Sequence, residues 1–324
     1  MENLLLISLT ILQWLTKGEV ILPEFFETPT LLASDMLEYR STTPLVNATV
    51  NQPVVVAKKV GKNLGAVISA KAAIIVDVHS GVILWQKEPD RKLPIASLTK
   101  LMTTAVFLEN NPGWDQVKAL EADENALAGA KFSVGNGVKL SLADLFFVTL
   151  TGSANNTALA LARSTGFSDE VFVERMNEKA REFGMSNSVF KEPTGLDREN
   201  SSTVTDLARL ALYVFSDARV QRATSIKEHK LKTIEPEDER TVKGTNKLLG
   251  TYLDHDPYDI VASKTGYTEE AGFCLIQETR QQEKGDVLIV ILGSPTEKDK
   301  HQDMKALVDW VFREYTWQVS SSGI

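Results

Sequence analysis

Three short patterns of chemistry-bearing residues follow one another along the 324-residue chain. They are Ser97-Leu98-Thr99-Lys100, Ser153-Ala154-Asn155 and Lys264-Thr265-Gly266. A Ser-x-x-Lys pattern alone is weak evidence, because about one occurs by chance in a chain of this length. A second one does occur, from Ser188 to Lys191, but only the first precedes the other two patterns. The ordered set predicts a nucleophilic serine with lysine as its base.

The first pattern lies in a stretch, Leu93 to Leu108, that predicts a helix beginning just after Pro94, because apolar residues recur at helical spacing. Ser97 then lies in the first turn, and Lys100 shares its face. A serine hydroxyl needs a base to become a nucleophile. A lysine can be that base if burial or a nearby like charge, such as that of Lys264, lowers its pKa. The structural alternative is a capping serine followed by an exposed lysine.

The second pattern follows a break between two helical runs, Leu140 to Leu150 and Asn155 to Arg163. A loop between helices presents side chains such as Ser153 and Asn155 to a site. There a hydroxyl can pass a proton, and an amide can hold a substrate's peptide group. The structural alternative is that Gly152 ends one helix and Ser153 caps the next.

The third pattern lies in a strand-like run from Asp259 to Gly266, followed by two more, Gly272 to Glu278 and Asp286 to Leu292. Short turns between these runs predict an antiparallel arrangement. An exposed strand bearing Lys264 can bind an extended peptide by strand addition, with the lysine attracting a carboxylate. The alternative is an edge strand whose lysine only discourages aggregation.

With these motifs and their flanks, the chain resembles the low-molecular-mass penicillin-binding proteins that act as serine-type D-alanyl-D-alanine carboxypeptidases. The resemblance extends over roughly Lys71 to Tyr315. The flanks that carry it include Ala73-Ile74-Ile75-Val76-Asp77, Thr194-Gly195-Leu196-Asp197, Lys264-Thr265-Gly266-Tyr267-Thr268 and Leu307-Val308-Asp309-Trp310-Val311-Phe312.

The resemblance implies an α+β fold of the β-lactamase/DD-peptidase kind. Its antiparallel sheet would have about five strands flanked by helices. A large helical part would run from Leu98 to Ser216. The first hairpin, Ala73 to Lys87, would pair with the three late strands and so bring the distant motifs together.

The resemblance also implies acyl transfer without metal or cofactor. Ser97 would attack the carbonyl between the two terminal D-alanines of a peptidoglycan stem peptide, and Lys100 would take the serine proton. The backbone amides of Ser97 and Tyr267 would form the oxyanion hole. Ser153 would help to return a proton to the departing D-alanine. Penicillin and other β-lactams mimic the dipeptide and would trap the same serine.

A further set of residues is expected to hold the substrate. Many relatives place an arginine in the loop before the last helix, where it helps to bind the substrate carboxylate. Counting back from Trp310, this chain offers Lys300, which keeps the charge but loses the bidentate fork. The expected substrate-holding residues are Asn155, Lys264, Thr265, Gly266, Tyr267 and Lys300.

The composition is that of an ordinary globular protein, with 43% hydrophobic and 24% charged residues. A net charge of −8 argues against nucleic acid as a partner. The four histidines show neither metal-ligand spacing nor the pattern of a Ser-His-Asp triad. The lone Cys274 lies in an expected strand and is interpreted as a small core residue.

The chain is expected to act outside the cytoplasm, because the inferred substrate lies there. Residues 1–20 contain an apolar run of twelve, Leu4 to Leu15, which fits a signal peptide or N-terminal anchor. Membrane attachment is expected through this segment only, since nothing matches the family's C-terminal β-rich domain and anchor helix. Residues 21–65 are interpreted as a linker with a short strand at Pro53 to Val56, residues 66–318 as the catalytic domain, and residues 319–324 as a tail.

Three functions compete. The first is the carboxypeptidase, with endopeptidase activity on cross-links as a related possibility. The second is a class A-like β-lactamase, whose deacylation loop resembles Glu-x-x-Leu-Asn. Here Glu192 is displaced by one residue and the asparagine is replaced by Asp197. The third is a non-catalytic β-lactam-sensing or wall-binding protein, which would not require Ser97, Lys100 and Lys264 together.

Overall fold

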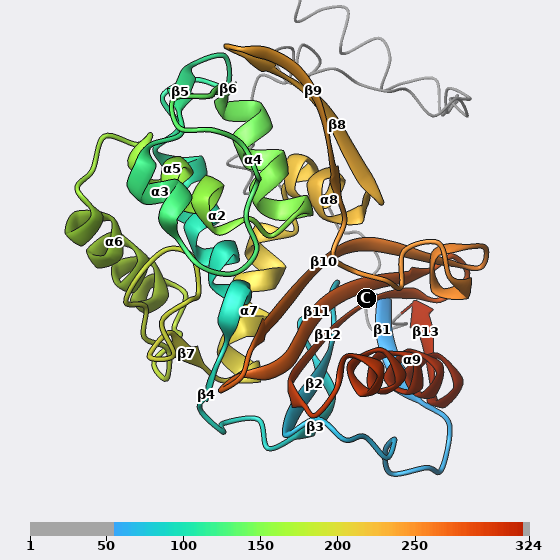
Figure 1. Ribbon diagram of the computed structural model, residues 1–324. Helices are drawn as coiled ribbons and strands as arrows, with labels where there is room; N and C mark the ends of the chain where they lie inside the picture. The colour runs from blue at the N-terminus through green and yellow to red at the C-terminus, as the bar shows by residue number, and fades with distance from the viewer. Residues whose placement is uncertain (1–54, 320–324) are drawn as a thin grey trace, which may run out of the picture. The chain divides into compact units, whose positions relative to one another are not determined.

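The computed structural model describes residues 55–319, in which five strands form one antiparallel sheet in the order β10-β11-β12-β2-β3 (Figure 1). The strands are β2 (Ala72–Asp77), β3 (Ile83–Lys87), β10 (Tyr258–Thr268), β11 (Gly272–Gln281) and β12 (Gly285–Ser294). β2 pairs with β12, so the first hairpin joins the three late strands as the resemblance implies. β10 forms one edge of the sheet.

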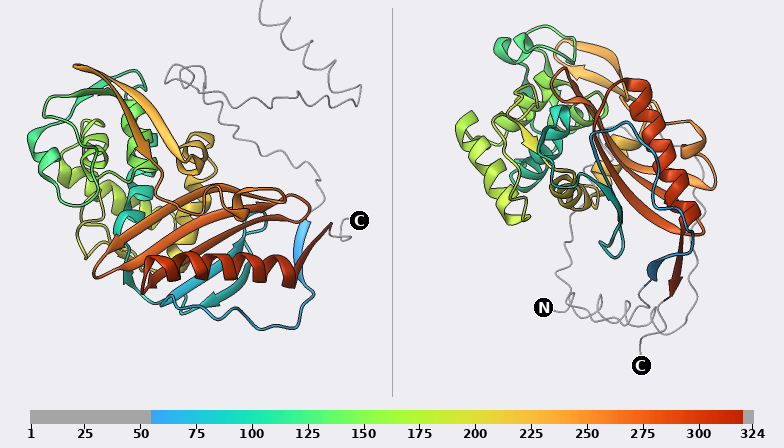
Figure 2. Two further views of the ribbon diagram at one scale, coloured as in Figure 1. Left: turned by 45° about the vertical axis from the view of Figure 1, so that its right-hand side comes forward. Right: turned by 90° about the horizontal axis from the view of Figure 1, so that it is seen from below.

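Both faces of this sheet are covered, which explains its nearly continuous apolar strands. On β2, Ile74 and Val76 face the helical part of the protein, whereas Ala73 and Ile75 join a second core against α9 (Glu297–Glu314). Figure 2 shows α9 along one face of the sheet and the other helices beyond the opposite face. The α+β fold expected from the resemblance is confirmed.

The helical part carries two of the three sequence patterns. Its central helix α2 is buried from Thr99 to Phe107, because other helices pack around it. The helices are η2 (Ala96–Leu98), α2 (Thr99–Glu109), α3 (Ala122–Ala126), α4 (Leu142–Thr151), α5 (Asn155–Arg163), α6 (Asp169–Glu182), α7 (Val204–Val214) and α8 (Ala218–Ser225). α7 packs against β12 and β2 and so joins this part to the sheet.

Short strand pairs and one further turn connect these elements. β8 and β9 form a long hairpin that the sequence pattern did not predict, because charged residues fill most of its positions and only Leu231 and Thr233 of β8 are buried. The antiparallel pairs are β1 (Val55–Lys59) with β13 (Tyr315–Val319), β4 (Leu93–Pro94) with β7 (Ser201–Ser202), β5 (Val117–Ala119) with β6 (Lys139–Ser141), and β8 (Glu228–Ile234) with β9 (Glu237–Lys243). The turn is η3 (Tyr252–Asp254).

Three boundaries differ from those expected. The predicted helix after Pro94 begins with the 3₁₀ turn η2, and the α-helix starts only at Thr99, because Ala96 has a left-handed φ of 48°. The helical part continues beyond Ser216 through α8. The short strand expected at Pro53 to Val56 within the linker is β1, which runs from Val55 to Lys59 and pairs with β13.

The N-terminal segment 1–20 and most of the expected linker lie outside the described residues. Within residues 55–319, no helix is both long and apolar enough to cross a membrane. In the same part of the chain, no group of three or more His, Cys, Asp or Glu side chains is placed to hold a metal ion.

Candidate active site

Ser97 is presented by the tight turn η2 between two glycines. A Cβ atom on Gly195, whose φ is +88°, would lie 2.0 Å from the Ala96 carbonyl oxygen and 2.9 Å from the Ser97 amide nitrogen. A Cβ atom on Gly266 would lie 3.2 Å from the same nitrogen. Only glycine therefore fits at Gly195, and the backbone of β10 passes close to Ser97. Ser97 itself is half-buried.

Lys100 lies one turn after Ser97 and is fully buried. Its amino group is 2.9 Å from the Ser97 hydroxyl, 2.7 Å from Oδ1 of Asn155 and 2.6 Å from the carbonyl oxygen of Thr194. Burial lowers the pKa of Lys100 to about 7, although the negative charge of Glu192 opposes this shift. A neutral fraction of Lys100 therefore exists near neutral pH, as a base for Ser97 requires.

The partners of Lys100 suit the neutral amine. An uncharged amine has two N–H bonds and one lone pair. Asn155 Oδ1 and the Thr194 carbonyl can only accept, so they take the two N–H bonds. The lone pair then remains for the Ser97 hydroxyl, which can donate its proton.

Asn155 is the first residue of α5 and is held by both ends of its amide. Its Oδ1 accepts from Lys100, and its Nδ2 donates to the carbonyl oxygen of Ala128 at 2.8 Å. Its backbone N–H donates to the carbonyl oxygen of Ala130. The sequence predicts that Asn155 holds the substrate. The structure shows, in addition, that its side chain contacts Lys100 directly.

Ser153 lies between α4 and α5 in a left-handed conformation, with a φ of 57°. It does not cap α5, whose N-cap is Ala154, so the helix-punctuation interpretation is wrong for this serine. Its hydroxyl instead lies 2.6 Å from the amino group of Lys264. A non-glycine residue with positive φ is uncommon, and such residues occur often at functional sites.

Lys264 reaches this serine from β10 and is almost completely buried. Besides Ser153, its amino group donates to the carbonyl oxygen of Thr265 at 3.0 Å. Burial, followed by the like charges of Lys100 and Lys300, holds the pKa of Lys264 well below its usual value. Lys100 from α2 and Lys264 from β10 are thus two buried amines, and the charge of the first disfavours the charged form of the second.

The residues after Lys264 lie along the edge strand. The Thr265 hydroxyl donates to the Thr245 hydroxyl at 2.7 Å. The ring of Tyr267 is exposed and stacks on Phe273, with 4.2 Å between ring centroids. Thr265 and Tyr267 are the two neighbours of Gly266, whose backbone lies close to Ser97.

Lys300 is placed apart from this cluster, near the start of α9. Its side chain is buried, and its amino group lies 6.0 Å from the centroid of the Phe273 ring. Burial lowers the pKa of Lys300 to about 8, and it makes no ion pair among residues 55–319. It influences Lys264 through charge but does not hydrogen-bond to any of the other expected site residues.

The loop between α6 and α7 supplies site groups that the sequence did not identify individually. The Thr194 carbonyl oxygen accepts from Lys100, and the Glu192 carboxylate accepts from the backbone amides of Thr194 and Gly195. Because every residue has a backbone carbonyl, the sequence could not identify the one at Thr194 as a partner of Lys100. From the sequence, Glu192 is identified only as a displaced counterpart of the β-lactamase glutamate.

The second Ser-x-x-Lys pattern has a structural role. Ser188 Oγ donates to Asp206 Oδ2 at 2.9 Å and lies 2.7 Å from the Ser202 hydroxyl. Lys191 is exposed. Ser188 is half-buried like Ser97, but Lys191 lacks the burial of Lys100, and the Ser188 hydroxyl contacts Asp206 and Ser202 rather than the lysine.

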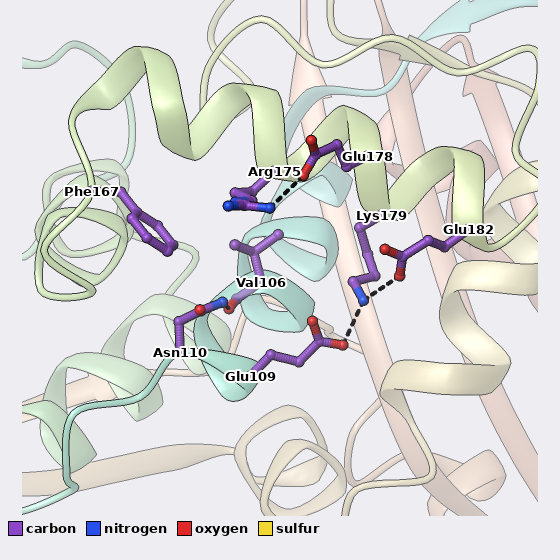
Figure 3. A pocket seen from close by; sticks show the side chains of 8 residues that line it. All are labelled: Val106, Glu109, Asn110, Phe167, Arg175, Glu178, Lys179 and Glu182. Carbon is purple, nitrogen blue, oxygen red and sulfur yellow. Dashed lines mark hydrogen bonds and ion pairs between the residues drawn. The ribbon is translucent and has the colours of Figure 1, made fainter.

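A hollow between α2 and α6 lies at the opposite end of α2 from Ser97 (Figure 3). Its charged groups are paired with one another: Lys179 contacts Glu109 at 2.7 Å and also Glu182, and Arg175 contacts Glu178 (Figure 3). Every charged side chain that lines this hollow therefore has an ion-pair partner within it.

Comparisons with known proteins agree with this geometry. Residues 57–296 match the family model described as D-alanyl-D-alanine carboxypeptidase. The chain is 31% identical over 254 residues to the D-alanyl-D-alanine endopeptidase of Pseudomonas aeruginosa, covering 78% of this chain and 80% of that protein. It is 29% identical to the D-alanyl-D-alanine carboxypeptidase DacF of Bacillus subtilis, covering 81% and 67%.

Solved structures give the same fold. The ampicillin-bound penicillin-binding protein D2 of Listeria monocytogenes superposes with a TM-score of 0.65 at 30% identity, covering 78% of this chain and 100% of that one. The Streptomyces K15 DD-transpeptidase superposes with a TM-score of 0.71 at 23% identity, covering 77% and 99%. The second likeness supports the fold alone.

Proposed function

The chain belongs to the D-alanyl-D-alanine carboxypeptidase family, and from this premise we propose that Ser97 is the nucleophile that forms its acyl-enzyme. The protein is a serine-type, penicillin-binding D-Ala-D-Ala carboxypeptidase that removes the terminal D-alanine of peptidoglycan stem peptides. The observation that carries the assignment of Ser97 is its 2.9 Å contact with the amino group of the fully buried Lys100.

In the acylation step, neutral Lys100 takes the proton of Ser97 as the serine oxygen bonds to the carbonyl carbon of the penultimate D-alanine. The negative charge then moves to the carbonyl oxygen. The backbone amides of Ser97 and Tyr267 are the proposed donors to it, because β10 passes η2 at Gly266. Donors fixed in position before the reaction are usually the largest single contribution to such catalysis.

The departing D-alanine needs a proton when its C–N bond breaks. Ser153 is the proposed donor, because its hydroxyl contacts Lys264 at 2.6 Å and can be reprotonated from there. Lys264 has a lowered pKa in the empty site. An arriving substrate carboxylate brings an opposite charge, which raises the pKa of Lys264 and keeps the amine protonated, so that its ammonium group holds the proton that passes to Ser153.

We assign the substrate's terminal carboxylate to Thr265 and Lys264. The Thr265 hydroxyl now donates to Thr245 and can turn to a ligand at low cost. Lys300 contributes charge from behind Phe273 rather than a direct contact. Asn155 would hold the peptide group before the scissile bond, and Gly266 lets the substrate lie along the edge of β10.

Hydrolysis by water then frees Ser97. The class A-like β-lactamase alternative needs a carboxylate that can activate this water. Glu192 is a poor candidate, because its oxygens accept from Thr194 N, Gly195 N and Asn200 Nδ2. We therefore expect the penicilloyl-enzyme to persist. A purely β-lactam-sensing or wall-binding protein would not need to transfer a proton to a leaving group, which is the role that we propose for the Ser153–Lys264 contact.

Cleavage of peptide cross-links is a second candidate activity, favoured by a specific observation. The relatives from Pseudomonas aeruginosa and Haemophilus influenzae, 31% and 30% identical, are both D-alanyl-D-alanine endopeptidases. Incubation with a cross-linked muropeptide dimer and with a monomeric pentapeptide, followed by chromatography, separates the two activities.

The substrate class also supports a place outside the cytoplasm. We propose that residues 1–20 direct export and attach the chain to the membrane, and that residues 66–318 are the catalytic domain, preceded by a linker over 21–65 and followed by a tail over 319–324. Fractionation of cells that produce the full chain, with and without residues 1–20, tests both statements about the N-terminus.

The proposed nucleophile is tested by D-alanine release from diacetyl-L-Lys-D-Ala-D-Ala. Ser97→Ala should lower the rate about a thousandfold or more. Ser188→Ala is the matched control, because it removes the serine of the other Ser-x-x-Lys pattern and should retain activity. Equal loss in both variants, or none in Ser97→Ala, contradicts the assignment.

A further inference from the structure

The carboxylate of Glu192 accepts several hydrogen bonds from the backbone of its own loop, which faces Lys100. Its Oε2 accepts from Thr194 N at 2.7 Å, and its Oε1 accepts from Gly195 N at 2.5 Å and from Asn200 Nδ2 at 2.7 Å. Asp197 N is a weaker fourth donor at 3.4 Å. A carboxylate has about four acceptor positions, so this loop uses nearly all of them.

Two of the amides held by Glu192 belong to residues that touch the catalytic groups. Thr194, whose N–H is bound by Glu192, offers its carbonyl oxygen to Lys100 at 2.6 Å. Gly195, bound in the same way, packs against the backbone of Ala96 and Ser97. The carboxylate therefore holds in place the Thr194 carbonyl that accepts from Lys100. It also holds Gly195, which packs against the turn that carries Ser97.

Glu192 also faces Lys100 with its charge. From β10, the facing charged group is Lys264, whose pKa Lys100 in turn lowers. The other groups in contact with the Lys100 amine, from η2, α5 and the loop, are neutral. Among residues 55–319, Glu192 is thus the opposite charge that acts on Lys100 and favours its protonated form.

We propose that Glu192 is a positioning residue for acylation, which sets both the place and the charge of Lys100 without touching the substrate. The proposal rests on the proposed function of Lys100 as the base for Ser97. It gives the glutamate a role different from water activation, for which its occupied oxygens are unsuited.

Two substitutions separate the two effects. Glu192→Gln removes the charge and replaces one acceptor by an NH₂ group that opposes the bound amides. Glu192→Asp keeps the charge, but its shorter side chain cannot reach both Thr194 N and Gly195 N. Glu199→Gln is the control, because it removes an exposed carboxylate from the same loop, where it pairs only with Lys191 at 3.5 Å.

The measurement is the second-order rate constant for acylation by benzylpenicillin between pH 5 and 9. In Glu192→Gln, the midpoint of the rise with pH should move about half to one pH unit lower, because a base without its opposite charge loses its proton more easily. The plateau should fall about tenfold, because the carbonyl that orients Lys100 is displaced. In Glu192→Asp, the plateau should fall while the midpoint stays.

Each outcome decides the matter. An unchanged plateau in Glu192→Asp, or a Glu192→Gln midpoint that is unmoved or higher, overturns the proposal, as does an equal shift in Glu199→Gln. If Glu192→Gln does not fold, the plateau of the Asp variant still tests the positioning role. Failure of the wild-type protein to be acylated would instead refute the proposed function itself.

Discussion

The amino group of Lys100 lies 2.9 Å from the hydroxyl of Ser97, and its two other contacts are with oxygens that can only accept. This arrangement directs the lone pair of a neutral lysine toward the serine. It also explains why burial matters here, since water would stabilise the charged form and remove the base.

The first prediction concerns pH. Burial lowers the pKa of Lys100 to about 7, so the neutral base is lost as the pH falls through that value. Acylation of the wild-type protein should therefore be slow at pH 5, rise through a midpoint near 7 and level off above it. Stopped-flow acylation by a chromogenic cephalosporin checks this. A rate that falls as pH rises from 6 to 8 would contradict a lysine base.

The second prediction concerns Asn155→Asp. The new carboxylate would lie where Oδ1 now lies, 2.7 Å from the Lys100 amine, and would raise the pKa of Lys100. The acylation midpoint should move upward by about one pH unit or more, opposite to the shift expected for Glu192→Gln. A downward shift would show that Asn155 does not contact the base.

The third prediction concerns Gly195→Ala. The added methyl group would meet the Ala96 carbonyl at 2.0 Å, so the turn carrying Ser97 must move. Acylation should fall about a hundredfold or more. The control is Gly166→Ala, since Gly166 has a similar φ of +84° but open space around its Cβ position. Equal effects of the two substitutions on acylation would indicate backbone strain rather than displacement of Ser97.

The fourth prediction concerns Ser153→Ala, which removes the hydroxyl that contacts Lys264. D-alanine release should fall about 10²- to 10⁴-fold, the usual range for loss of a proton-transfer group. The variant should still fold, because the Lys264 amine keeps the Thr265 carbonyl as an acceptor, and thermal unfolding checks this. The outcome against the account is full turnover in a folded variant.

The sheet and the meeting of the three patterns were predictable because both depend on residue type. Strand-like runs joined by short turns predicted β10, β11 and β12 and their antiparallel arrangement, and the resemblance supplied β2 and its pairing with these strands. The order of the three motifs allowed the prediction that they meet at one site. The residues that do so are Ser97, Lys100, Ser153, Asn155 and Lys264.

What the sequence did not predict depends on backbone geometry or on tertiary position. The acceptor role of the Thr194 carbonyl leaves no mark in the sequence. The separation of Lys300 from the hydrogen-bonded cluster follows from how α9 packs behind Phe273. The 3₁₀ turn at Ser97 requires a left-handed Ala96, an uncommon conformation for a residue with a side chain.

The central claim is that Ser97 forms a lasting covalent intermediate, and intact-mass spectrometry after addition of benzylpenicillin tests it most directly. The account predicts that wild type gains the mass of one penicillin and keeps it for minutes, whereas Ser97→Ala gains nothing. An adduct that clears within seconds while penicillin is consumed would identify a β-lactamase. No adduct on the wild-type protein, or an equal adduct on Ser97→Ala, would contradict the account.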